Sequence, residues 1–199
     1  MDGGYIMIPL AVLLLLTIFI FTERCVVINR STKSDLGFMA ELKELLRSGN
    51  IRGAEELCEN SKAPYAGMLL KGVQRVGRPI TEVTAAIENT GNLEVSNLGR
   101  GMTWLSTTAA GAPMLGFLGT VIGMIEAFFQ LAQAGAQNNI SLLSGGIYQA
   151  LVTTVAGLIV GIIALFAYNY LASRIARATT LMEAKTMEFL DILNSPASR

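Results

Sequence analysis

The sequence predicts an all-α membrane protein that crosses a bilayer three times. Hydrophobic residues make up 52% of the 199 residues and charged residues only 15%, and the apolar residues gather in long blocks. Between Arg100 and Arg174 the only acidic residue is Glu126, in a stretch long enough to cross a bilayer twice. Every lysine and arginine lies either between Arg24 and Arg100 or from Arg174 onward, an asymmetry typical of multispan proteins.

Composition also excludes several classes of function. The chain has no histidine, so the commonest general base and metal ligand is absent. Cys25 and Cys58 lie too far apart in the sequence to form a chelating motif. The net charge is zero and the basic residues form no cluster, so nucleic-acid binding is not expected. We therefore expect no enzyme activity, no metal and no organic cofactor.

The first transmembrane helix is expected at residues 5–22, after a short N-terminus of residues 1–4. A signal peptide would begin with basic residues and end at a small-residue cleavage site. Here the basic residues follow the apolar run and the chain begins Met-Asp-Gly-Gly. The segment is therefore interpreted as an uncleaved anchor.

Residues 23–104 predict a cytoplasmic helical region. Ser34-Asp35 can cap a helix that ends near Gly49, and Asn50 can cap a shorter helix. The first of these helices would carry an apolar face formed by Leu36, Met39, Leu42, Leu45 and Leu46.

Further helices in this region are expected to begin at Pro64 and Pro79. From Pro79 the helical pattern continues toward Trp104 without a clear stop, although Gly91, Gly99 and Gly101 weaken it. The second span is therefore expected to project into a cytoplasmic helical bundle.

The second span is expected at residues 105–131 and the third at 142–172, joined by an outer connection of residues 132–141. A C-terminal cytoplasmic helix is expected at residues 173–199, continuous with the third span. The positive-inside rule places the N-terminus outside and the C-terminus in the cytoplasm. Both cysteines then face the reducing side and are expected to be free thiols.

Small residues recur at spacings of three and four along the second and third spans. Such stripes allow the close backbone approach on which helix association in lipid depends, within one subunit or between subunits. On the second span they are Ala109, Ala112, Gly116, Gly119 and Gly123; on the third they are Ala150, Thr154, Gly157, Gly161 and Ala164.

Four polar residues on these spans fall into two levels. Thr120 lies 20 residues from Arg100, and Thr154 lies 20 residues from Arg174, so both are roughly 30 Å from the arginines. Glu126 and Gln149 are 26 and 25 residues from the same arginines and form a second, outer level. A threonine in a span can bond back to its own helix or offer its hydroxyl to a polar path.

Glu126 has three open interpretations. Its carboxyl group can be protonated, paired with Gln149, or close enough to the outer surface to reach water. On a regular helix it lies about 120° from Thr120, so the two side chains need not face the same cavity.

Two segments carry a resemblance to a known family. APMLGFLGTVIGMI begins at Ala112, and GIYQALVTTVAGL begins at Gly146. They resemble the MotA/TolQ/ExbB proton-channel family, most of all its ExbB branch, and the family's three-span layout extends the likeness to nearly the whole chain. The paired segments are far more specific than a lone glycine motif.

The resemblance implies a role, partners and site residues. It implies a homopentamer in a bacterial inner membrane around an ExbD-like dimer whose single span carries a proton-accepting aspartate. Inward proton flow would drive a TonB-like transducer that energises outer-membrane transport, or a TolQ-like system that maintains the envelope. A passive scaffold or non-proton pore remains a third interpretation. By position, Thr120 and Thr154 match the family's pore-facing threonines.

The chain departs from the family pattern at two positions. Gln149 stands where ExbB proteins have a glutamate in the third span, and an amide cannot titrate. Ile163 stands where they have a proline, so no proline kink is expected there. Glu126 is a candidate to replace the missing carboxylate.

Overall fold

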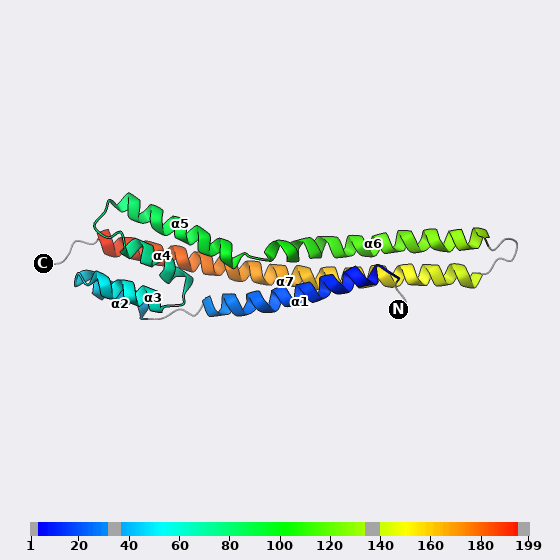
Figure 1. Ribbon diagram of the computed structural model, residues 1–199, viewed down its shortest axis with the longest axis horizontal. Coiled ribbons are helices and arrows are strands. Elements are labelled where there is room, and N and C mark those ends of the chain that lie inside the picture. The colour runs from blue at the N-terminus through cyan, green and yellow to red at the C-terminus, as the bar shows by residue number, and fades with distance from the viewer. Residues whose placement is uncertain (1–3, 32–36, 134–139, 195–199) are drawn as a thin grey trace. The chain divides into compact units, whose positions relative to one another are not determined.

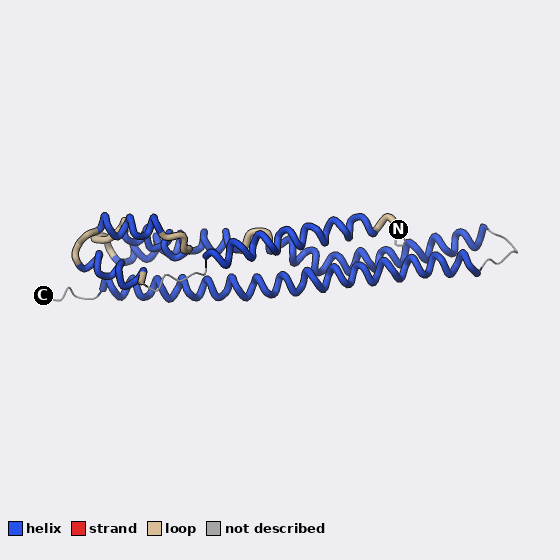
Figure 2. The backbone as a smooth tube through the Cα atoms, turned by 90° about the horizontal axis from the view of Figure 1, so that it is seen from below, coloured by secondary structure: helices blue, strands red, loops and turns tan. Residues whose placement is uncertain are grey.

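The computed structural model describes residues 4–31, 37–133 and 140–194, and every regular element in these ranges is a helix (Figures 1 and 2). Three stretches are long and apolar enough to cross a membrane, in α1, α6 and α7. The prediction of an all-α chain with three spans is confirmed at this level. The helices are α1 (Met7–Ser31), α2 (Phe38–Arg47), α3 (Ile51–Asn60), α4 (Pro64–Val73), α5 (Ile80–Leu98), α6 (Met102–Gln133) and α7 (Ile140–Asn194).

The chain divides into two compact units that differ sharply in charge. The apolar unit comprises Met1–Glu23 and Gly101–Leu171, and the charged unit comprises Arg24–Arg100 and Ala172–Arg199. All 15 lysines and arginines belong to the charged unit and none to the apolar unit. Helices α1 and α7 contribute residues to both.

The charged unit has a conventional hydrophobic core. Leu42 of α2, Leu69 of α4, Ile87 of α5 and Phe189 of α7 are fully buried in one cluster. Four short sequence segments therefore fold around the C-terminal part of α7, because each helix has one apolar face to bury.

Local signals in the sequence account for the ends of these helices. Asn50 caps α3, since its side-chain oxygen accepts a hydrogen bond from the Gly53 amide at 3.0 Å. Pro64 is the first residue of α4 and Pro79 immediately precedes α5. These three predictions are confirmed, whereas the predicted cap at Ser34-Asp35 and the apolar Leu36 lie outside the described residues.

The predicted extension of the second span needs a correction. Helix α5 ends at Leu98 and α6 begins at Met102, so the helical pattern is interrupted before the span. Gly101 has φ +80°, a left-handed conformation that suits glycine and ends a helix. The corresponding prediction for the third span is confirmed, because α7 is one helix of 55 residues through Ile163.

Both cysteines are free thiols, as predicted. Cys58 is buried in the core of the charged unit. Burial, together with the nearby carboxylates of Glu55 and Glu59, raises the pKa of the Cys58 thiol to about 12. The thiol is therefore protonated at neutral pH, which makes it a packing group and a poor nucleophile.

Candidate functional site

Helices α6 and α7 of the apolar unit run antiparallel and touch through their small residues, a contact we call the seam (Figure 1). A Cβ atom built on Gly116 would lie 3.2 Å from the Cα atom of Gly157, and one built on Gly123 would lie 3.1 Å from the Cβ atom of Ala150. Gly119 meets the side chain of Thr153. The stripes thus pack against each other within one subunit.

At several points of the seam a glycine lies directly against backbone atoms of the other helix. A Cβ atom on Gly157 would lie 2.6 Å from the carbonyl oxygen of Ala112, too close for any side chain. A Cβ atom on Gly161 would lie 2.6 Å from Pro113 and 3.2 Å from the carbonyl oxygen of Ala109. Proline has no amide hydrogen, so Pro113 leaves that carbonyl without its usual helical donor, and glycine lets the partner helix cover it.

The two threonines singled out from the sequence lie beside the seam. The Thr154 hydroxyl donates to the Gly116 carbonyl across the seam at 3.0 Å, whereas the Thr120 hydroxyl donates back to Phe117 in its own helix at 2.6 Å. Gly116 lies one turn from Thr120 and accepts from Thr154, so the two hydroxyl groups occupy neighbouring levels. Both side chains are only half-buried.

Helix α1 covers one side of the seam, which we call the α1 flank. Leu10 is buried there against Ala112 and Val160, with Leu115 and Ala156 beside them. Taking 3.6 residues per turn, these contacts put α1 on the side of α7 that carries Val160 and Ala156.

The threonines occupy the opposite side, which we call the threonine flank. Thr120 lies about 60° to one side of the centre of the α6 stripe, and Glu126 lies about 60° to the other. On α7, Thr154 and Gln149 likewise lie on opposite sides of the centre of the small-residue stripe. Because the helices are antiparallel, Thr120 and Thr154 share the threonine flank, while Glu126 and Gln149 share the α1 flank.

Glu126 and Gln149 line one small cavity of about 220 Å³ together with Gln130. The rest of its wall comes from small residues of the seam, Gly123, Ala127, Gly145 and Gly146. Gln149 also lies near the residues that precede α1, since a Cβ atom on Gly4 would lie 2.5 Å from its amide nitrogen. The structure therefore brings the carboxylate and the amide together and separates both from the threonines.

Sequence reasoning missed two contributors to the seam. Thr153 is 1% exposed, and its hydroxyl donates to the Gln149 carbonyl in its own helix at 3.0 Å. Gly146 lies against Ala127, with a built Cβ atom 2.5 Å from the alanine Cβ atom. The sequence could have predicted the second contact from a spacing of four, which separates Gly146 from Ala150 and Gly123 from Ala127.

The chemistry available in the apolar unit is hydrogen bonding and proton exchange. Its polar groups near the seam are hydroxyls, amides and one carboxyl group, and the described residues contain no cluster of three metal-ligating side chains. Hydroxyls can both donate and accept, so they can hold water or a partner's carboxyl group in a polar path.

Comparison with known proteins gives a consistent match. The model of the MotA/TolQ/ExbB proton channel family matches residues 60–184. A putative biopolymer transport protein, ExbB-like 3 of Synechocystis sp., is 29% identical over 187 residues, covering 94% of this chain and 89% of that protein. The ExbB protein of Neisseria gonorrhoeae is 29% identical over 188 residues, covering 85% and 84%. A putative ExbB homolog of Methanothermobacter thermautotrophicus is 34% identical over 145 residues, covering 73% of this chain and 50% of that protein.

Proposed function

The chain belongs to the MotA/TolQ/ExbB proton channel family, and on this basis we propose that it is the ExbB-like subunit of an inner-membrane proton-driven motor. The family is one of non-enzymatic transport proteins, and this chain is not an enzyme. In our proposal, inward proton flow through the assembled complex energises TonB-dependent transport across the outer membrane.

The proposed assembly is a pentamer of this chain around an ExbD-like dimer. Each partner chain would contribute one membrane helix with an aspartate that takes up and releases protons. A TonB-like transducer would receive the mechanical output. A TolQ-like motor would share this assembly and differ in the protein that it drives.

One observation supports the proposed pathway above others, namely the position of Thr120 and Thr154 on the flank that α1 leaves uncovered. Side chains around them on the same flank, such as Phe117, Leu151 and Leu158, are apolar and exposed in the single chain. A partner helix that lies on this flank would find two hydroxyl groups at neighbouring levels in an otherwise apolar wall. Hydroxyls in such a wall can hydrogen-bond a carboxyl group in either protonation state.

The proposed orientation places the charged unit in the cytoplasm and both the N-terminus and the α6–α7 connection in the periplasm. It is supported by the distribution of charge, since the charged unit holds every lysine and arginine of the chain. Retention of basic residues on the cytoplasmic side is the general rule for bacterial inner-membrane proteins.

Native mass spectrometry tests the assembly directly. The chain is co-expressed with its genomic neighbours and extracted in the mildest detergent that releases it from the membrane. We expect five copies together with a sub-stoichiometric single-span protein that carries a membrane aspartate. A stable assembly that never contains such a partner would favour a passive scaffold and contradict the motor.

We further propose that Glu126 and Gln149 act at the outer end of the pathway, from the α1 flank. Their shared cavity puts an exposed carboxyl group beside two amides, where it can exchange protons with outside water. Glu126→Gln is expected to lower proton-coupled activity by about fivefold without changing assembly, which is less than is general for a group that transfers the proton in the reaction itself. Activity is measured as transducer-dependent uptake in cells.

Glu126→Asp is the matched control, because it shortens the side chain and keeps the carboxyl group. If Glu126→Gln leaves uptake at the wild-type level while Thr154→Ala abolishes it, Glu126 has no part in the pathway.

A further inference from the structure

A second polar pocket lies in the charged unit, where α4 ends and the chain turns into α5. It has a volume of about 450 Å³, within the general range for small-ligand sites. Three cationic side chains line it, together with two amides and a hydroxyl, and no carboxylate is among the lining residues. The lining residues are Lys71, Gln74, Arg75, Arg78, Ala86, Asn89 and Thr90.

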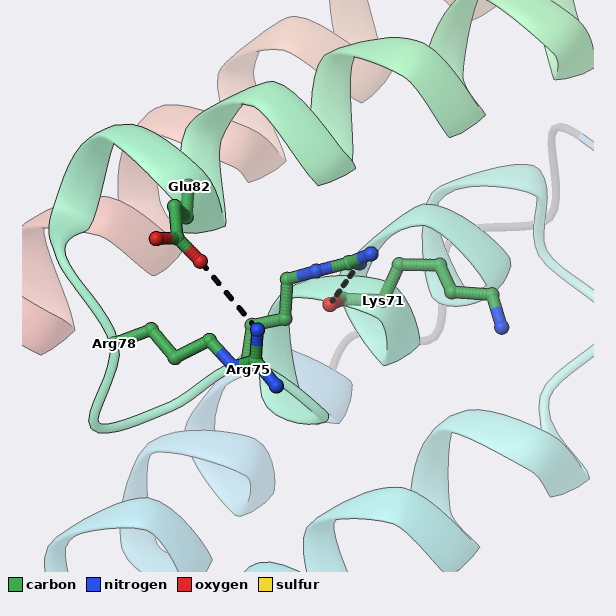
Figure 3. Close-up of polar contacts among 4 residues, drawn as sticks. All are labelled: Lys71, Arg75, Arg78 and Glu82. Atoms are coloured by element: carbon green, nitrogen blue, oxygen red, sulfur yellow. Dashed lines mark hydrogen bonds and ion pairs between the residues drawn. The ribbon is translucent and has the colours of Figure 1, made fainter.

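Figure 3 shows two of the contacts that these cations make, Arg78 with Glu82 and Arg75 with the Lys71 carbonyl. Arg78 pairs with Glu82 at 3.5 Å, in a contact whose side chains are 63% and 52% exposed. Lys71 donates to the Gln74 side chain at 3.3 Å, and Arg75 donates to the Lys71 carbonyl at 3.5 Å. Among the described residues, the three cations that line the pocket have one carboxylate as an ion-pair partner, which leaves a local excess of two positive charges.

Helix capping explains only part of this arrangement. Cations in the last turn of a helix complement its dipole, and this accounts for Lys71 and Arg75 at the end of α4. It does not account for Arg78 beyond the turn, or for Asn89 and Thr90 of α5, which line the same hollow. A concave site with guanidinium, ammonium and amide donors has the chemistry that phosphate groups select.

We propose that this pocket binds a phosphate group carried by a small anion. Arg75 and Arg78 offer forked donors to phosphate oxygens, Lys71 adds a third positive charge, and Asn89 supplies a neutral donor from α5. The phosphate group belongs either to a soluble compound or to a phospholipid headgroup. The site is independent of the threonine flank and of the proposed motor function.

Calorimetry of the full-length protein in phosphate-free detergent buffer tests the soluble source, with inorganic phosphate and pyrophosphate as probes. We expect saturable binding that weakens at least about tenfold in Lys71→Gln/Arg75→Gln, which removes two charge-assisted donors. The matched control is Arg47→Gln/Arg52→Gln, which removes the same charge from exposed positions outside the pocket. The affinity of this control for the phosphate probes is expected to stay within about twofold of wild type, because a change in net charge alone has only a weak, salt-screened effect.

Nanodiscs of phosphatidylcholine with and without phosphatidylglycerol test the lipid source. Retention of phosphatidylglycerol through purification, lost in the pocket variant and kept in the control, would assign the site to a headgroup. Arg75→Lys separates geometry from charge, because it keeps the charge and loses the fork, and is expected to weaken binding severalfold. If neither probe binds, or if pocket and control variants lose binding equally, the cations are merely solvated and the proposal is wrong.

Discussion

Replacing Gly157 by leucine is expected to prevent α6 and α7 from packing, so that little folded protein accumulates. A Cβ atom at this position already lies 2.6 Å from the Ala112 carbonyl oxygen and 2.8 Å from the Gly116 Cα atom. Both are backbone atoms, so the clash is relieved only if the helices separate. The measurement is the yield of monodisperse protein by size-exclusion chromatography after extraction.

Gly111 provides the matched control for this substitution. It lies in α6, and a Cβ atom built there meets nothing within 4 Å. Gly157→Ala is expected to destabilise the protein by about 1–3 kcal/mol through overpacking, while Gly111→Ala is expected to be neutral or stabilising. Equal melting temperatures for the two alanine variants would show that the seam is looser than described.

Thr154→Val is expected to lower proton-coupled activity at least about tenfold, while the complex still assembles. Valine keeps the shape of threonine and removes the hydroxyl that donates to the Gly116 carbonyl. The structural loss is small, because such a hydrogen bond in lipid contributes on average about 0.6 kcal/mol. Proton uptake into vesicles containing the co-expressed complex measures activity, and native mass spectrometry measures assembly.

The neighbouring threonine is a stringent control. Thr153→Val removes a hydroxyl that bonds back to Gln149 in its own helix, at the seam. This change is expected to be tolerated, and Thr154→Ser, which retains a hydroxyl, is expected to restore activity. Similar loss in Thr153→Val and Thr154→Val would mean that packing, and not the position of the hydroxyl, decides activity. Full activity of Thr154→Val would support the scaffold interpretation.

Helical periodicity explains why much of the fold could be predicted from the sequence. Spans are set by runs of apolar residues, and the stripes follow from spacings of three and four. A fixed rise per residue placed Thr120 and Thr154 at similar depth before any contact was known. In the structure they lie at neighbouring levels, because Thr154 donates to the Gly116 carbonyl and Gly116 lies one turn from Thr120.

The position of α1 could not be predicted in this way. The span part of α1 is apolar all round, so its sequence does not indicate which face packs against α6 and α7. The burial of Leu10 against Ala112 and Val160 shows which flank is covered. Because α1 packs on the side of Glu126, this contact leaves Thr120 and Thr154 on the uncovered side of the seam.

The break before α6 could be predicted only in part. Gly99 and Gly101 lower the helix propensity of this stretch, but not by enough to require a helix end, so the apolar pattern appears continuous. The positive φ of Gly101 is a property of the backbone that residue identity permits but does not require.

The seam between α6 and α7 has a mechanical consequence. Interfaces built from long side chains can absorb a small displacement by changing rotamers, but glycine and alanine have no side-chain torsions to change. At Gly116, Gly123 and Gly157 the two helices touch through backbone atoms and a single methyl group. A force applied to one helix is therefore transmitted to the other with little side-chain rearrangement, and the two helices move together as one rigid pair.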